Sequence, residues 1–197
     1  GESEQMAKND QLDRAYAHPN DTWLDGIDLE IATTINWFRA QKFILNWNNE
    51  HLSNINVRRA IQSVMPVETM AQAANEAGYN ASPTQLQTGL RESIHGEYLG
   101  DDFTSQLIKY PVGSNTDAAT EYMQEAGYTQ QGGDWVSPDG EAVEFNILSR
   151  SNTGQALPTQ AFSDALNGFG IGTEVNAIGE DYYTTLQNWE FDMGWVW

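Results

Sequence analysis

Two hydrophobic periods alternate along the chain from residue 42 onward, one typical of strands and one of helices. Short β-prone runs predict strands at 42–47, 142–148, 172–178 and 191–197. Apolar residues three and four positions apart predict helices at 53–65, 67–77, 115–126, 159–167 and 181–189. Strands that alternate with helices favour an α/β fold in which some of the strands pair in parallel.

Capping residues mark where several of these helices begin. Ser53 can cap the first helix, and Pro66 stands where the second can begin. Asn115 or Thr116 can cap the third, because their side-chain oxygens accept hydrogen bonds from free backbone N–H groups. The pattern therefore predicts helix starts at three places between residues 53 and 116.

Turn signals give two further expectations. The Ser-Pro-Asp-Gly turn at 137–140 predicts a hairpin between a short strand at 135–136 and the strand that follows. Periodicity weakens at 79–113, where proline and glycine recur. This stretch fits either a long functional loop or a series of short helices.

Net charge is the strongest compositional signal. Twenty-eight acidic residues against nine basic ones give a formal net charge of −19. This excludes a nucleic-acid partner, because binding phosphates requires a cationic surface. Self-repulsion of this size destabilises a compact chain in dilute buffer, whereas molar salt shortens the screening length to about 3 Å. The composition favours a salt-adapted, haloarchaeal-like protein, with an ordinary acidic secreted protein as the alternative.

No sequence motif carries catalytic chemistry. The chain has no cysteine and no Gly-x-Ser-x-Gly pattern, which leaves no convincing nucleophile. His18, His51 and His95 each lack a second histidine at ligand spacing, so the sequence predicts no metal and no cofactor. No apolar run approaches the roughly 18 residues of a membrane span. Asn20 and Asn80 begin N-glycosylation patterns, which favour a secreted chain.

Tryptophan is unusually frequent, with seven residues. Trp195 and Trp197 stand two positions apart in the last predicted strand and therefore share one face. Such a pair could stack on a ligand. Core packing is the alternative, and it is the commoner role of any single tryptophan.

Three stretches of the chain carry a family resemblance. The first is Phe-Ile-Leu-Asn at 43–46, followed by a helix that contains Val-Arg-Arg-Ala at 57–60. The second covers 115–128 and ends in Ala-Gly-Tyr. The third begins with Gly-Asp-Trp-Val at 133–136 and ends with Phe-Asp-Met-Gly-Trp at 191–195. In this order they resemble the family 5 extracellular solute-binding proteins, which bind peptides, nickel complexes and occasionally sugars for ABC importers.

This resemblance implies one lobe of a class II periplasmic-binding-protein-like clamshell, a mixed sheet flanked by helices. Residues 42–197 would form the second lobe, truncated at its C-terminus, and residues 1–41 the tail of an incomplete first lobe. Asn46 and Trp47 would lie beside the first strand that crosses between the lobes. Trp195 and Trp197 would lie on the cleft wall. These four residues are the predicted ligand-binding residues.

The function implied is that of a non-enzymatic solute-binding component of an ABC importer. It would bind di- or oligopeptides in a cleft between two lobes and dock on the membrane subunits of the importer. An oligosaccharide-binding member of the family is the alternative, and a carbohydrate-active enzyme domain is a further one. We expect an extracellular location at the cell surface, a lipid anchor in the full-length protein, and self-association of the truncated chain through its apolar surface.

Overall fold

The computed structural model describes residues 2–9, 11, 41–79, 81–151 and 154–196. Helix α1 (Glu2–Lys8) precedes the segment 12–40, which lies outside this description. The next elements are β1 (Lys42–Leu45), α2 (Glu50–Ser53), α3 (Ile55–Val64), α4 (Val67–Glu76), η2 (Glu92–Ile94), α5 (His95–Tyr98) and α6 (Asp101–Thr104). They are followed by α7 (Thr116–Glu125), β2 (Thr129–Gln131), β3 (Asp134–Val136), β4 (Glu144–Arg150), α8 (Ala156–Phe169), β5 (Gly172–Ile178), α9 (Tyr182–Gln187) and β6 (Met193–Val196).

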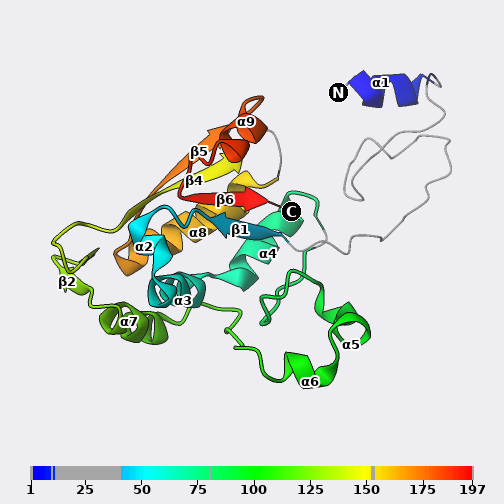
Figure 1. The fold of residues 1–197 in the computed structure, drawn as a ribbon. Helices are drawn as coiled ribbons and strands as arrows, with labels where there is room; N and C mark the ends of the chain where they lie inside the picture. Colours follow the sequence, from blue (N-terminus) through cyan, green and yellow to red (C-terminus); the bar gives the residue numbers. More distant parts are fainter. Residues whose placement is uncertain (1, 10, 12–40, 80, 152–153, 197) are drawn as a thin grey trace.

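A four-stranded mixed sheet forms the centre, with the strand order β1-β6-β4-β5 (Figure 1). Strand β4 pairs in parallel with both β5 and β6, and β1 closes one side antiparallel to β6. The predicted strands at 42–47, 142–148, 172–178 and 191–197 are therefore confirmed in outline, as is the parallel pairing of some of them. Because β4, β5 and β6 all point the same way, their carboxyl ends meet at one edge of the sheet, where the start of β1 also lies.

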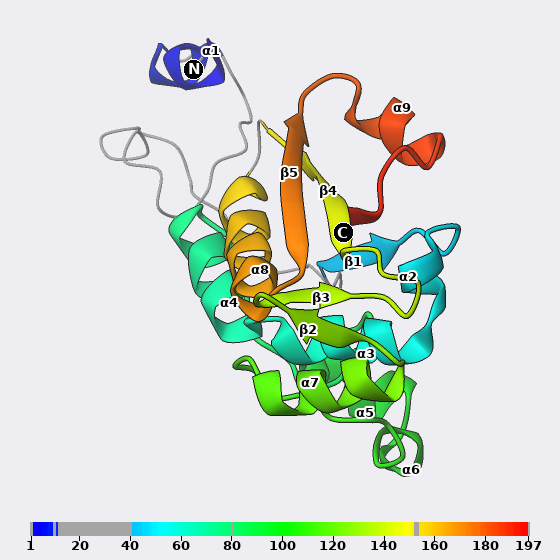
Figure 2. The ribbon, with the colours of Figure 1, turned by 90° about the vertical axis from the view of Figure 1, so that its left-hand side faces the viewer.

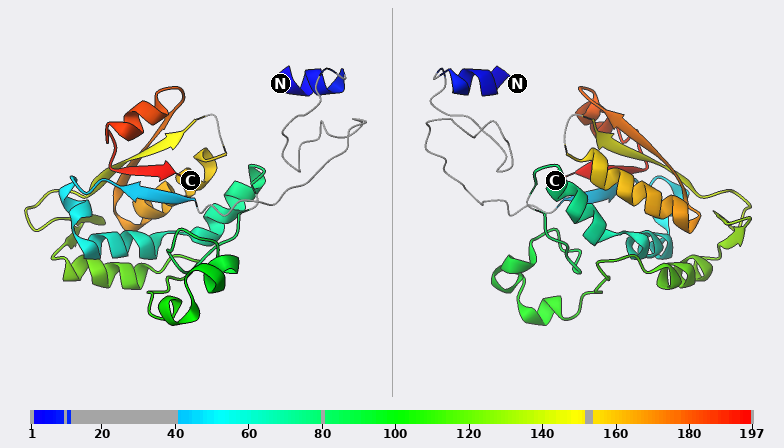
Figure 3. Two further views of the ribbon diagram at one scale, coloured as in Figure 1. Left: turned by 45° about the vertical axis from the view of Figure 1, so that its right-hand side comes forward. Right: turned by 180° about the vertical axis from the view of Figure 1, so that it is seen from behind.

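The two faces of the sheet are covered unequally, as the alternation of side chains requires. One face carries Phe43, Phe145, Ile147, Met193 and Trp195 and packs on α3 and α8 in the larger core. The opposite face carries the smaller cluster of Leu148, Ile44 and Ile178, which packs against Tyr182, Leu186 and Phe191. Figure 3 shows α9 on this second face, across the sheet from α3 and α8.

Helix boundaries differ from the sequence predictions at residues 49–54. Ser53 is not a cap: it ends the short helix α2, whose cap is Asn49. Helix α3 then begins after Asn54, whose side-chain oxygen accepts from the Asn56 N–H at 2.9 Å. Asparagine at each start satisfies N–H groups that lack helical partners, so a separate short helix, α2, precedes the predicted one. Asn115 does cap α7, accepting from Ala118 N–H at 3.1 Å.

The predicted hairpin is present only as a single antiparallel bridge, and a longer hairpin lies one turn earlier. Strands β2 and β3 pair antiparallel around Gly132 and Gly133, both at positive φ, which suits a tight turn. The turn at 137–140 instead leads from β3 toward β4, with a single bridge between Val136 and Ala142. Figure 2 shows this hairpin at one end of α8, where Trp135 N–H donates to Gly170 O at 2.8 Å.

The stretch 79–113 contains the short helices η2, α5 and α6. Of the two alternatives that the sequence left open, a long loop or a series of short helices, the structure has the short helices. None of the helices in the described segments is long and apolar enough to cross a membrane.

Candidate functional site

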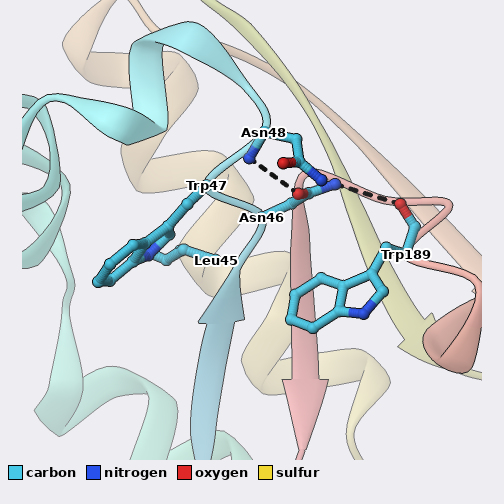
Figure 4. A pocket seen from close by; sticks show the side chains of 5 residues that line it. All are labelled: Leu45, Asn46, Trp47, Asn48 and Trp189. Carbon is cyan, nitrogen blue, oxygen red and sulfur yellow. Dashed lines mark hydrogen bonds between the residues drawn. The ribbon is translucent and has the colours of Figure 1, made fainter.

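A shallow pocket of about 360 Å³ lies where β1 ends. We call it the tryptophan hollow; it is lined by Leu45, Asn46, Trp47, Asn48 and Trp189 (Figure 4). It brings together two predicted binding residues, Asn46 and Trp47, with one that the sequence did not single out.

Asn46 holds the floor of the hollow together. Its side-chain amide donates to the carbonyl oxygens of Trp189 at 3.1 Å and Phe191 at 3.0 Å. Its side-chain oxygen accepts from Asn48 N–H at 3.1 Å. The two bonds from the amide join the end of β1 to the segment between α9 and β6, and the third closes a local turn. In this chain Asn46 therefore connects two parts of the lobe rather than presenting a free amide.

Trp47 stands at the rim, where 68% of its surface is exposed. The Arg58 guanidinium lies 4.7 Å from the centre of its ring, and the same group donates to the carbonyls of Leu52 and Ser53, at 2.8 Å each. Arg58 thereby caps α2 and orients the indole through a cation–π contact. The exposed face of Trp47 is an apolar surface held in place.

Trp189 is the residue that sequence reasoning missed. It lies just past α9 at φ 59, the one residue other than glycine with positive φ in the described part of the chain. Its N–H donates to Leu186 O, and the N–H of Glu190 donates to Thr185 O, which closes α9 as glycine usually does. A left-handed tryptophan costs about 1–2 kcal/mol. Stacking on Phe191, with ring centres 5.6 Å apart, offsets part of this cost.

Trp195 does not line the hollow. It is 3% exposed and lies in the larger core, edge-on to Phe43 at 4.8 Å. This burial favours the packing role that the sequence left open beside the ligand-binding one. Trp197 lies outside the described residues.

The opposite end of the sheet forms a second candidate surface, which we call the carboxyl edge. The strand registers place Lys42 level with Val196 and Arg150 level with Ile178. Extending the β4–β6 register from Leu148 and Gly194 places all four in one row, on the face that α9 covers. In open α/β sheets ligands bind outside the carboxyl ends of parallel strands. The carboxyl edge, not the tryptophan hollow, is where this rule places a ligand.

Two cations lie in that row. Lys42 is exposed, and Arg150 is half-buried with its guanidinium 5.2 Å from the centre of the Tyr183 ring. One strand, β6, lies between them, and two strand spacings set their backbones about 10 Å apart. Tyr182, the neighbour of Tyr183, donates from its hydroxyl to Trp195 O and fixes the start of α9 to β6. Two positive charges on one edge stand out in a chain of net charge −19.

Comparison with known families decides the identity of this fold. The chain matches the middle region of the bacterial extracellular solute-binding proteins, family 5, over residues 3–197. It belongs to that family. Family 5 is a family of transporter binding proteins and is not enzymatic.

Solved structures of binding proteins share the fold. The NikA protein of Brucella suis in complex with Fe(III)-EDTA is 17% identical with a TM-score of 0.60, over 80% of this chain and 30% of its own. The mannohexaose-bound periplasmic oligopeptide-binding protein of Thermotoga maritima is 18% identical with a TM-score of 0.61, over 80% of this chain and 29% of its own. The MelB binding protein of Agrobacterium fabrum in complex with stachyose is 13% identical with a TM-score of 0.59, over 81% of this chain and 26% of its own. A comparison with curated proteins gave no match.

The chain therefore spans about 30% of the length of these structures. Its α/β fold, with a mixed sheet flanked by helices, matches that part of a periplasmic binding protein, and both the family and the fold predicted from the sequence are confirmed. The ligands in these structures differ from one relative to the next.

Proposed function

We propose that the protein is the solute-binding component of an ABC importer and that residues 42–197 form its second lobe. Membership of family 5 and the likeness to periplasmic binding proteins support this role. Residues 1–41 would belong to the tail of the first lobe. The membrane subunits of an importer would be its partners, and its place would be outside the cell at the membrane surface, held by a lipid anchor.

The ligand would meet this lobe at the carboxyl edge. Strand β1 enters the sheet at Lys42 and β6 runs toward the same edge at Val196, so connections to a first lobe would lie there. A ligand held between two lobes would contact the surface beside those connections. Trp197 follows Val196 directly, which keeps it a candidate for the cleft wall.

A peptide is the ligand that the charge of this edge favours. Every free peptide carries a carboxylate, and Lys42 and Arg150 provide two cations within reach of one. A neutral oligosaccharide would gain nothing from them, although exposed aromatic rings such as Tyr183 can also stack on sugars. The two cations at the carboxyl edge are the observation on which the peptide proposal rests.

Native mass spectrometry of the complete protein, purified in high salt, tests the ligand class. Peptide masses that co-purify would support the proposal. Masses spaced by hexose units would establish the oligosaccharide alternative, and a bound nickel complex would replace both. A first lobe that binds the same ligand without this chain would refute a cleft between two lobes.

Matched substitutions at the two ends of the sheet test where the ligand binds. Arg150→Gln removes a cation at the carboxyl edge, and we expect peptide affinity in calorimetry to fall about tenfold or more, as for loss of a charge-assisted hydrogen bond. Trp47→Ala removes an exposed aromatic ring at the tryptophan hollow and should leave affinity unchanged. The reverse result would assign the ligand to Asn46 and Trp47 instead.

A further inference from the structure

The fold brings together a histidine and two glutamates that line neither candidate ligand surface. Glu50 and His51 begin α2, and Glu141 comes from the turn between β3 and β4. One ligand atom from each residue lies within 4.8 Å of the others. The glutamates are exposed, whereas His51 is only 7% exposed, so the group is open to solvent on one side.

His51 has one nitrogen engaged and one available. Its Nδ1 lies 2.8 Å from the hydroxyl of Tyr128, itself 6% exposed. Its Nε2 makes no hydrogen bond among the described residues. The imidazole also meets Tyr128 and Phe145 edge-on, with ring centres at 5.7 and 6.2 Å. Metal-binding histidines commonly donate their other ring N–H to a carboxylate, a backbone carbonyl or water, and here the Tyr128 hydroxyl would accept in that place, which leaves Nε2 for a metal.

The backbones that carry the glutamates are fixed as well. Asn49 caps α2 by accepting from the N–H groups of His51 and Leu52 at 3.0 and 3.3 Å, which positions Glu50. Ser137 and Glu141 close the other turn through two bonds: Ser137 N–H to Glu141 O at 2.8 Å, and Glu141 N–H to Ser137 Oγ at 3.2 Å. Only the glutamate side chains need to move to complete a site.

We propose that Glu50, His51 and Glu141 bind one divalent transition-metal ion of the zinc class, with water in a fourth position. Imidazole with carboxylates suits Zn²⁺ and its neighbours, whereas Ca²⁺ and Mg²⁺ take oxygen ligands alone. Two ligands bonded at about 2.1 Å in tetrahedral geometry stand about 3.4 Å apart. The atoms lie within 4.8 Å of one another, so they need to close by at most about 1.4 Å, within the reach of exposed glutamate rotamers. The bound ion would tie α2 to the turn at 137–141. This proposal does not depend on the importer function.

Zinc binding to the complete protein, stripped of metal with EDTA, tests the proposal. We expect calorimetry with ZnCl₂ to show one ion bound at this cluster and the melting temperature to rise. Glu141→Gln and Glu50→Gln should each weaken binding at least tenfold, and because both residues are exposed the variants should fold normally. Glu121→Gln, an exposed glutamate on α7, is the matched control and should bind as the wild type does.

Tyr128→Phe tests the orientation of His51. Loss of the hydroxyl should lower zinc affinity about 10- to 100-fold, while the ring still fills its place in the core. Co²⁺ in place of Zn²⁺ should give visible absorption bands that Glu141→Gln alters. No zinc binding by the wild type, equal binding by Glu141→Gln and wild type, or CaCl₂ binding as tightly as ZnCl₂ would each overturn the proposal.

Discussion

Asp192 joins three parts of the lobe, and its replacement by alanine gives the sharpest test of how the sheet is held. One carboxylate oxygen accepts from the Asn49 side-chain amide at 2.8 Å, and the other accepts from Asn146 N–H at 2.8 Å. Asn49 caps α2, Asn146 lies in β4, and Asp192 leads into β6. One side chain therefore connects a helix start to two strands.

The expected loss follows from these two bonds. Hydrogen bonds to a charged group contribute about 1.5–3 kcal/mol each where they are buried; since this site is only half-buried, we expect Asp192→Ala to cost about 2–3 kcal/mol in total. At roughly 2–4 °C per kcal/mol for a chain of this length, the melting temperature should fall by about 5–10 °C. Asp192→Asn keeps one acceptor and should lose about half as much.

Urea denaturation in high salt, followed by tryptophan fluorescence, measures this difference. Asp181→Ala is the control: it removes the same charge just before α9, where the aspartate side chain makes no capping bond. A loss for Asp192→Ala no larger than for Asp181→Ala would refute the view that Asp192 connects α2, β4 and β6.

Three further outcomes are expected. Gly170→Ala should lower the free energy of unfolding by about 2–3 kcal/mol, because Gly170 has φ +92 and an added Cβ would meet Gly133 O at 2.1 Å. Gly168→Ala is the control and should cause no loss, because nothing lies within 4 Å of the Cβ it adds. The melting temperature should keep rising in molar KCl, because a net charge of −19 repels itself; a plateau at ordinary ionic strength would contradict salt adaptation. The pKa of Glu92 is lowered by hydrogen bonds from Gln85 N–H and then from the Thr84 hydroxyl. Because the pKa is lower in the folded state, Glu92 stabilises the fold at pH values above its unfolded-state pKa of about 4.3. This stabilisation is lost as the pH falls through the folded-state pKa. The stability advantage of wild type over Glu92→Gln should therefore shrink on acidification below that value, and an advantage constant with pH would contradict it.

The elements of the sheet could be predicted because local pattern and tertiary structure agree there. Strand β5 has the predicted bounds 172–178, and helix α8 ends at Gly170 in the left-handed conformation that a glycine after a helix predicts. The errors fell where neighbouring residues offer equivalent choices. Asn49, Ser53 and Asn54 can all cap a helix, and only the packing of Leu52 into the core selects the two asparagines.

The functional surfaces depend on contacts that periodicity cannot show. Trp189 looked like the end of a helix because tryptophan seldom takes positive φ, and its stacking on Phe191 becomes visible only in the fold. Lys42 and Arg150 are 108 positions apart, yet strand register sets them in one row. A usable signal did exist: Lys42 begins a predicted strand and Arg150 stands two residues past the end of another, in a chain that has only nine lysines and arginines.

The proposed metal cluster shows the same limit more strongly. In the sequence His51 has no second histidine nearby, and Glu141 stands 90 positions away among many carboxylates. The fold supplies what spacing lacks, because the end of α7 places Tyr128 against Nδ1 while the turn from β3 places Glu141 beside Glu50. Three segments with separate reasons for their positions converge on one histidine. That convergence, rather than the abundance of acid on the surface, distinguishes this cluster from the other carboxylates of an acidic protein.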